Sequence, residues 1–326
     1  MAITAFPIAH ERISERVAQA ARRGLAAHPK TLPPWLFYDE TGSRLFDQIT
    51  ELPEYYLTRT ERGIFEANAG AMIARAAAGD RLRLAELGAG SADKTRLLLA
   101  AAVRRQGAVV YEPLDVSESA LEAAAERIER EQPRVLVAPH VVDYTIWLEL
   151  GPPTPGERRL LLYIGSSIGN FEPDEAAALL ELVRKSLRPG DALLLGVDLV
   201  KASDVLLAAY DDAAGVTAAF NRNILTRLNR ELGADFDPAE FVHRAEWNPT
   251  ASRMEIYLES KRAQSVQIPA FDFRVHFGPG ERIHTENSYK YRPGQAEEML
   301  ARAGFRAEAT WTDRRGWFAV CLGRAE

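Results

Sequence analysis

A regular alternation of short apolar runs and helical segments, between residues 62 and 197, is the feature that most constrains the fold. The runs have the length of buried strands, and the segments between them have the length and periodicity of helices. Strands and helices that alternate in this way form right-handed βαβ units around a parallel sheet. We therefore predict an α/β fold with a doubly wound, Rossmann-like sheet, with strands at residues 82–87, 108–115, 135–142, 159–164 and 191–197 and helices at 60–78, 94–105, 117–131 and 173–187.

The first part of the chain, residues 1–61, does not follow this rhythm. An amphipathic helix is predicted at residues 10–27, and Pro33-Pro34 prevents its continuation because proline lacks a backbone donor. Aromatic residues then gather between Trp35 and Tyr56 around two predicted polar turns. They form either a small aromatic core or, because several are tyrosines with polar tips, part of a binding site.

Residues 201–289 also depart from the α/β pattern, since a helical stretch at 206–232 is followed by alternating strands at 253–260 and 265–275. We expect an inserted α+β domain here.

The α/β pattern returns at residues 290–326, with a helix at 293–303 and an antiparallel hairpin, 306–312 with 317–322, at the sheet edge. Residues 62–200 and 290–326 are thus expected to form one domain, and residues 201–289 a second. We assign residues 1–61 to the second domain, as its N-terminal helical and aromatic part.

Composition excludes several classes of function. The net charge of −6 and the lack of a long basic run argue against nucleic acid and anionic membranes as partners. The single cysteine and the six histidines without ligand spacing argue against a metal site. No apolar segment is long enough to span a membrane, and no secretion signal begins the chain. We expect a cytoplasmic monomer that acts on a small molecule.

Polar residues at three strand ends indicate a bound adenosine. The first strand ends in Gly88-Ala89-Gly90, and the second and third end near Asp115 and Asp143-Tyr144. Ligands of doubly wound sheets bind at these carboxyl ends, where a carboxylate can accept both ribose hydroxyls and an aromatic ring can stack on adenine. Either acidic residue alone is more often a helix cap, but features in register at three strand ends favour adenosine.

The chain lacks the third glycine of the dinucleotide fingerprint, a P-loop and an arginine clamp for phosphate. This argues against NAD and against nucleoside phosphates as the cofactor.

Longer motifs carry a resemblance to a known family. They are LPEYYLTRTE (52–61), ELGAGSADKTRLLL (86–99), PLDVSESAL (113–121), GSSIGNF (165–171), YDDAAGVT (210–217), FNRN (220–223) and IHTENSYKY (283–291). With them the chain, from about Leu32 to its C-terminus, resembles the histidine-specific Nα-methyltransferases of ergothioneine biosynthesis. The resemblance implies a class I methyltransferase sheet with a substrate-binding domain. It also implies that three S-adenosyl-L-methionine molecules trimethylate L-histidine to hercynine, with S-adenosyl-L-homocysteine as the second product and no metal.

The resemblance also implies roles for individual residues. Those that contact the cofactor are Gly88, Lys94, Asp115, Asp143 and Tyr144, where Tyr144 replaces the family's usual phenylalanine. Those that hold the amino and carboxylate groups of the substrate, and so act in catalysis, are Tyr55, Asn170 and Tyr210, with Gly165 close by. Tyr38 is either a further contact to the growing ammonium or a packing residue.

Three more residues concern the substrate side chain. Glu286 and Ser288 are implied to bind the imidazole, although Glu286 could instead neutralise Lys290 or Arg282. Ile256 stands where the family has a methionine, and Met254 shares its strand face.

Two other functions remain open. The first is Nα-methylation of another aromatic amino acid such as tryptophan, against which the charge of Glu286 argues. The second is a non-catalytic adenosine-binding module, which intact cofactor residues disfavour.

Overall fold

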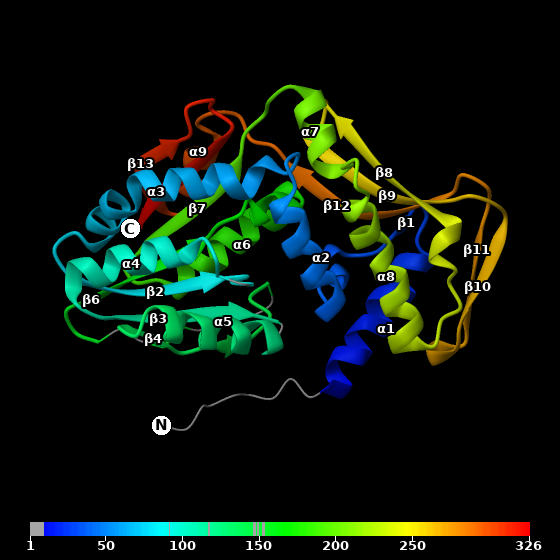
Figure 1. Cartoon of the computed structure of the whole chain (residues 1–326), viewed down its shortest axis with the longest axis horizontal. Coiled ribbons are helices and arrows are strands. Elements are labelled where there is room, and N and C mark those ends of the chain that lie inside the picture. Colours follow the sequence, from blue (N-terminus) through cyan, green and yellow to red (C-terminus); the bar gives the residue numbers. More distant parts are fainter. Residues whose placement is uncertain (1–9, 91, 117, 146–147, 149, 152–153) are drawn as a thin grey trace. The chain divides into compact units, whose positions relative to one another are not determined.

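The computed structural model describes residues 10–90, 92–116, 118–145, 148, 150–151 and 154–326 (Figure 1). Ser91 of the glycine loop and Ser117, the predicted start of a helix, lie outside the described residues. The chain divides into two compact units: unit 1 contains Leu57–Val200 and Lys290–Glu326, and unit 2 contains the described residues before Leu57 and Lys201–Tyr289. The functional roles predicted for residues 1–61, for 62–200 with 290–326, and for 201–289 stay predictions.

Unit 1 is built on one sheet with the strand order β13-β14-β7-β6-β2-β3-β4, and β5 also pairs with β3. Its strands are β2 (Arg81–Leu87), β3 (Val109–Asp115), β4 (Val135–Val137), β5 (His140–Val141), β6 (Glu157–Tyr163), β7 (Ala192–Asp198), β13 (Phe305–Thr312) and β14 (Phe318–Ala325). The pairs among β2 to β7 are parallel, whereas β14 runs antiparallel to β7 and to β13. The predicted doubly wound sheet with its antiparallel terminal hairpin is confirmed.

One strand prediction in unit 1 needs correction. Residues 135–142 form two short strands, β4 and β5, which both pair with β3. Pro139 lies between them and cannot donate a ladder hydrogen bond, so pairing is interrupted there.

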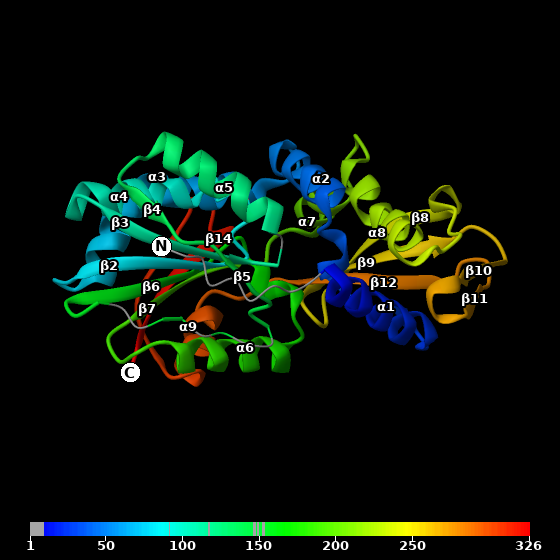
Figure 2. The ribbon, with the colours of Figure 1, turned by 90° about the horizontal axis from the view of Figure 1, so that it is seen from below.

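Helices cover both faces of this sheet. They are α3 (Tyr56–Ala77), α4 (Thr95–Gln106), α5 (Glu118–Glu131), α6 (Pro173–Ser186) and α9 (Gln295–Arg302). In Figure 2, α3, α4 and α5 lie on one side of the sheet, and α6 and α9 lie on the other. Aliphatic side chains of the central strands, such as Leu84, Leu160 and Leu194, are fully buried between the layers. No helix among the residues described has the length and apolar composition needed to cross a membrane.

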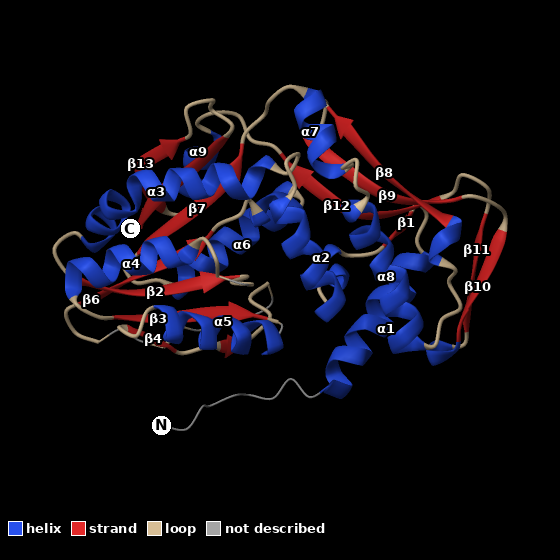
Figure 3. Ribbon diagram, viewed as in Figure 1, coloured by secondary structure: helices blue, strands red, loops and turns tan. Residues whose placement is uncertain are grey.

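Unit 2 contains a four-stranded sheet with the order β1-β12-β9-β8 and a separate two-stranded hairpin, β10-β11 (Figure 3). The strands are β1 (Lys30–Thr31), β8 (Phe241–Asn248), β9 (Arg253–Ser260), β10 (Gln264–Ile268), β11 (Phe273–Phe277) and β12 (Arg282–Tyr289). The helices are α1 (His10–Ala26), α2 (Glu40–Glu51), α7 (Ser203–Tyr210) and α8 (Val216–Leu232). Single-turn 3₁₀ helices lie at η1 (Pro34–Phe37) and η2 (Ser167–Asn170, in unit 1), and at η3 (Pro238–Glu240) and η4 (Pro269–Phe271).

Three predictions for unit 2 are wrong in detail. The helical stretch at 206–232 is two helices, because Asp212 accepts hydrogen bonds from the amides of Val216 (3.0 Å) and Thr217 (2.7 Å) and so starts α8 anew. The predicted strand at 265–275 is a hairpin that turns at η4. In place of polar turns after Trp35, the chain forms α2, which is capped by Asp39.

Candidate functional site

The glycine loop that follows β2 lies against the end of β3. Gly88 and Gly90 both have positive φ, +65° and +48°, a conformation that favours glycine. The amide of Gly88 donates to the carbonyl of Leu114 (2.8 Å), and the amide of Gly90 donates to the Asp115 carboxylate (3.2 Å). A Cβ atom on Gly88 would lie 3.0 Å from the Tyr144 hydroxyl, so the loop passes close to that ring.

Asp143 and Tyr144 follow β5 beside the same strand end. The amide of Val142 donates to the carbonyl of Asp115 (2.9 Å), and Asp143 accepts from the amide of Thr145 (3.0 Å). Desolvation of its hydroxyl, reinforced by the negative charges of Asp115 and Asp143, raises the pKa of Tyr144 above the usual range. The structure therefore brings four of the five predicted cofactor residues together at the carboxyl ends of the strands.

The fifth, Lys94, belongs to a partly buried cluster that the sequence did not predict. Its ammonium donates to the carboxylate of Glu61, a residue of α3 that has no exposed surface. The same carboxylate accepts from the amide of Gly165, at 2.9 and 3.0 Å. A Cβ atom on Gly196 would lie only 2.2 Å from Glu61 Oε1, so glycine at that position makes room for the carboxylate. In the sequence, Glu61 is a charged residue on an otherwise apolar face of the predicted helix, and this pattern was the available indication of a buried carboxylate.

The loop after β6 has a tight turn that connects this cluster to Asn170. Gly165 and Ser166 both have positive φ, +80° and +61°, which is unusual for serine. Ser166 Oγ accepts from the amide of Asp198 (2.9 Å) and so holds the turn. A Cβ atom on Gly165 would lie 3.3 Å from Lys94 Nζ. Asn170 ends η2 and is half-buried.

Glu86, the last acidic residue before the glycine loop, is buried beneath it. It accepts from the hydroxyl of Thr95 (2.8 Å) and from the hydroxyl of Tyr111. Burial raises the pKa of Glu86 to about 7, despite these hydrogen bonds and the positive charge of Lys94, which lower it.

These residues fit an adenosine-bearing cofactor that has an amino-acid tail. The glycine loop presents backbone without side chains, Asp115 is a carboxylate for a ribose, and Tyr144 is a ring for a base. Lys94 adds a cation suited to a carboxylate.

In unit 2, aromatic rings connect the predicted substrate residues. Tyr38 packs edge-on against Phe46, with ring centroids 5.7 Å apart, and Phe46 packs against Tyr55 (6.2 Å). Tyr55 in turn packs against Tyr210 (6.4 Å). Tyr55 and Tyr210 are buried, whereas Tyr38 is half-buried.

Strand β12 presents the predicted imidazole-binding residues on the face that includes Tyr210. The hydroxyls of Tyr210 and Ser288 lie 2.7 Å apart and share a hydrogen bond. Glu286 is paired with Ile256 of β9, and Ser288 with Met254, and directly paired residues point to the same face. The structure therefore brings Glu286 and Ser288 together with the apolar residues predicted to line the imidazole.

Both cations considered as alternative partners of Glu286, Lys290 and Arg282, contact other carboxylates. Lys290 Nζ lies 2.8 Å from Asp198, and both side chains are fully buried. Arg282 contacts Glu246 and Glu259, each at 2.8 Å.

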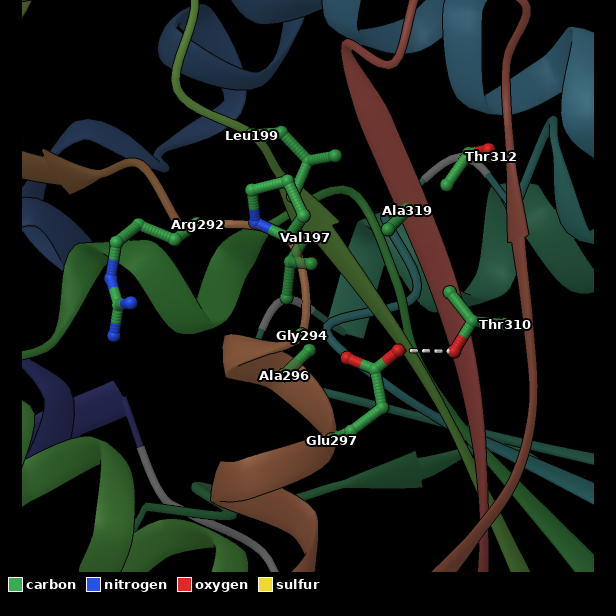
Figure 4. A pocket seen from close by; sticks show the side chains of 10 residues that line it. Val197, Leu199, Arg292, Gly294, Ala296, Glu297, Thr310, Thr312 and Ala319 are labelled. Atoms are coloured by element: carbon green, nitrogen blue, oxygen red, sulfur yellow. Dashed lines mark hydrogen bonds between the residues drawn. The ribbon is translucent and has the colours of Figure 1, made fainter.

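A cavity of about 120 Å³ lies elsewhere in unit 1, between α9 and the ends of β7, β13 and β14 (Figure 4). Glu297 and Thr310 form a 2.6 Å hydrogen bond in its wall. None of the predicted site residues lines it, and it is smaller than the roughly 300–1,000 Å³ that small-molecule sites usually occupy.

Comparison with known proteins finds a family match over most of the chain. The sequence profile of the family described as "Histidine-specific methyltransferase, SAM-dependent" matches residues 17–325. The chain is 44% identical to a histidine N-alpha-methyltransferase of Mycolicibacterium smegmatis, over 97% of each protein.

Two fungal relatives are more distant. An ergothioneine biosynthesis protein 1 of Neurospora crassa is 31% identical over 87% of this chain and 32% of that protein. A 4-dimethylallyltryptophan N-methyltransferase of Arthroderma benhamiae is 28% identical over 94% of this chain and 92% of that protein.

Proposed function

Because the chain belongs to the family of histidine-specific, S-adenosylmethionine-dependent methyltransferases, we propose that it trimethylates the α-amino group of L-histidine to give hercynine. This reaction is the first step of ergothioneine biosynthesis, which agrees with the fungal relative of that name. The observation that carries the choice of substrate is the placement of Glu286 and Ser288 on one face, with Ser288 bonded to Tyr210.

Unit 1 supplies the residues for the cofactor. When bound, S-adenosylmethionine provides an electrophilic methyl group on a sulfonium. Asp115 accepts the ribose hydroxyls, Asp143 binds the adenine amine and Tyr144 stacks on the base. Gly88 lets the backbone approach, and Lys94 binds the carboxylate of the methionine part, while Glu61 holds its ammonium in place. S-adenosylhomocysteine is bound by the same residues.

Tyr55, Asn170 and Tyr210 hold the part of the substrate that all amino acids share. The Asn170 side chain can both donate and accept, so it suits an amine beside a carboxylate. The hydroxyl of Tyr210 is oriented by Ser288, at 2.7 Å. Holding the amine in line with the methyl group supplies several kcal/mol of the barrier, because alignment no longer has to be achieved during the reaction.

A neutral amine is the nucleophile, and a proton must leave before the second and third transfers. The methyl donor is reactive, so the site needs no strong base, and a tyrosine hydroxyl or water can pass the proton on. The faces of Tyr38, Tyr55 and Tyr210 stabilise the growing ammonium by cation–π attraction, typically about 0.5–2 kcal/mol.

Glu286 and Ser288 select the substrate side chain. An ionised Glu286 accepts from an imidazole N–H, and Ser288 provides the second polar contact. Ile256 and Met254, on the same face, line the ring with apolar surface. A phenyl ring offers no N–H to the Glu286 carboxylate, and the N–H of an indole sits on a larger ring at a different position, so both rings match the polar groups of the site less well than imidazole does.

Titration calorimetry with a panel of amino acids, in the presence of S-adenosylhomocysteine, tests this function. We expect histidine and its mono- and dimethylated forms to bind, and tryptophan and phenylalanine to bind at least tenfold more weakly. Conversion of histidine to hercynine is then followed by mass spectrometry. Tighter binding of tryptophan than of histidine would refute the proposed substrate.

A further inference from the structure

Strand β12 contains a β-bulge immediately before Glu286. His284 is paired with Tyr257 of β9, but Glu286 is paired with the adjacent Ile256, so Thr285 is an extra residue on β12. In a regular strand, residues 284, 286 and 288 would point to one face, the face on which the His284 ring packs against Tyr257 (5.2 Å). The bulge therefore turns Glu286 to the opposite face, where Ile256 lies.

Asn221 of α8 bonds to both strands at this bulge. Its side-chain oxygen accepts from the hydroxyl of Thr285 (2.9 Å), which also reaches the carbonyl of Ile256 (3.2 Å). Its side-chain nitrogen donates to the carbonyl of Tyr257 (3.0 Å). Asn221 and Thr285 are buried, so these bonds do not compete with solvent.

His243 extends this connection from Asn221 to Tyr210. The nitrogen of Asn221 donates to His243 Nδ1 (2.9 Å), because an amide nitrogen has no acceptor capacity. His243 Nε2 therefore carries the proton, and it donates to the carbonyl of Tyr210 (2.8 Å). Burial lowers the pKa of His243, which agrees with a neutral ring. Tyr210 is in turn connected to β12 by the hydrogen bond between its hydroxyl and that of Ser288.

We propose that Asn221, His243 and Thr285, here called the bulge network, are positioning residues that determine selectivity for the imidazole side chain. They hold the bulge that directs Glu286 and Ser288 to the face with Ile256, and they fix the end of the helix that carries Tyr210. The inference rests on the proposed function, since it assumes that Glu286 and Ser288 bind the substrate side chain. Asn221 lies in the motif FNRN and Thr285 in the motif IHTENSYKY.

Thr285→Val tests the bulge network, because it removes the hydroxyl and keeps the shape of the side chain. We expect the KM for histidine to rise about tenfold, as for the loss of one hydrogen bond to the substrate. We expect kcat to change less than threefold and the affinity for S-adenosylhomocysteine to stay the same. Thr285→Ser keeps the hydroxyl and should restore the KM. Thr310→Val, which removes a threonine hydroxyl from the cavity of Figure 4, is the matched control and should leave the KM unchanged.

A purely structural role would lower kcat and the melting temperature at an unchanged KM, and that result would overturn the inference. An equal KM increase in Thr285→Ser and Thr285→Val would overturn it as well. If Thr285→Val does not fold, the same comparison is made with Asn221→Asp, which keeps the acceptor for Thr285 and loses the donors to His243 and Tyr257. A parent protein that fails to methylate histidine would refute the proposed function instead.

Discussion

The buried carboxylate of Glu61 accepts a hydrogen bond from the ammonium of Lys94, which lies 33 residues further along the chain. Glu61 also accepts from the amide of Gly165, so one carboxylate holds a predicted cofactor residue and the loop that leads to Asn170. Burying an ion costs free energy unless the ion is paired with an opposite charge. Here the ammonium of Lys94 provides that charge for the buried carboxylate of Glu61.

We therefore expect Glu61→Ala to lower the free energy of unfolding by about 3 kcal/mol, because the charge of Lys94 and the Gly165 amide lose their partner. Lys94→Met should also destabilise the protein, but the double variant should lose clearly less than the sum of the two changes. Urea unfolding of the parent, the two single variants and the double variant, with S-adenosylhomocysteine absent, measures the interaction free energy between Glu61 and Lys94. Strictly additive losses would show that the pair contributes no interaction.

Asp115→Ala should weaken cofactor binding. Charge-assisted hydrogen bonds to the ribose contribute roughly 1.5–3 kcal/mol, so the affinity for S-adenosylhomocysteine should fall about 10–150-fold. Titration calorimetry measures this affinity, and Asp174→Ala, at an exposed position of α6, is the matched control. Equal affinity of parent and Asp115→Ala would remove Asp115 from the cofactor site.

Asn170→Ala should weaken the binding of every amino acid by a similar factor, because Asn170 contacts the groups that all of them share. The comparison uses histidine and tryptophan, each titrated in the presence of S-adenosylhomocysteine. A variant that lost histidine but bound tryptophan as before would assign Asn170 to the side chain of the substrate instead.

Glu286→Ala should reduce the initial rate of histidine methylation at least tenfold, since the imidazole N–H loses its acceptor. The rate with tryptophan should stay equal or improve, because a carboxylate beside an apolar ring is unfavourable. Glu298→Ala, on the exposed side of α9, controls for loss of a surface charge. If both rates fall by one factor, Glu286 has only a structural role.

Stability should depend on pH through Glu86. Its pKa is raised from 4.5 to about 7 in the folded protein, so the native state binds more protons than the unfolded state between these values. The contribution of Glu86 to the free energy of unfolding therefore falls as the pH rises from 4.5 to 7, by up to about 3 kcal/mol. Above pH 7 this contribution no longer changes.

Glu86→Gln removes this titration and should flatten the curve of unfolding free energy against pH in that window. The exposed Glu181→Gln should leave the curve unchanged. Parallel curves for the parent and Glu86→Gln would contradict the raised pKa.

The order of strands and helices in unit 1 was predictable from local pattern. A buried parallel strand requires a short apolar run, and the connection between parallel strands requires a helix, so both are visible in the sequence. The predicted cofactor residues Gly88, Asp115 and Asp143 follow from the same logic, because strand ends of a parallel sheet lie at one edge. The chain's own motifs were specific enough to indicate the family that the comparisons confirm.

Where local pattern failed, a single residue changed the geometry. Pro139 divides a predicted strand, and Asp212 starts a new helix in a stretch that was predicted to be one helix. Such residues are visible in the sequence, but whether they interrupt an element depends on the hydrogen bonds available around them.

Only the tertiary structure decided which face Glu286 occupies and what surrounds Lys94. The period of a strand is two, so the one extra residue at Thr285 inverts the face of every residue after it, and sequence alternation does not reveal where a bulge lies. The partners that hold these side chains are distant: Glu61 is 33 residues from Lys94, and Ser288 is 78 residues from Tyr210. Sequence determines which groups can bond, and the packing of distant elements determines which of them meet.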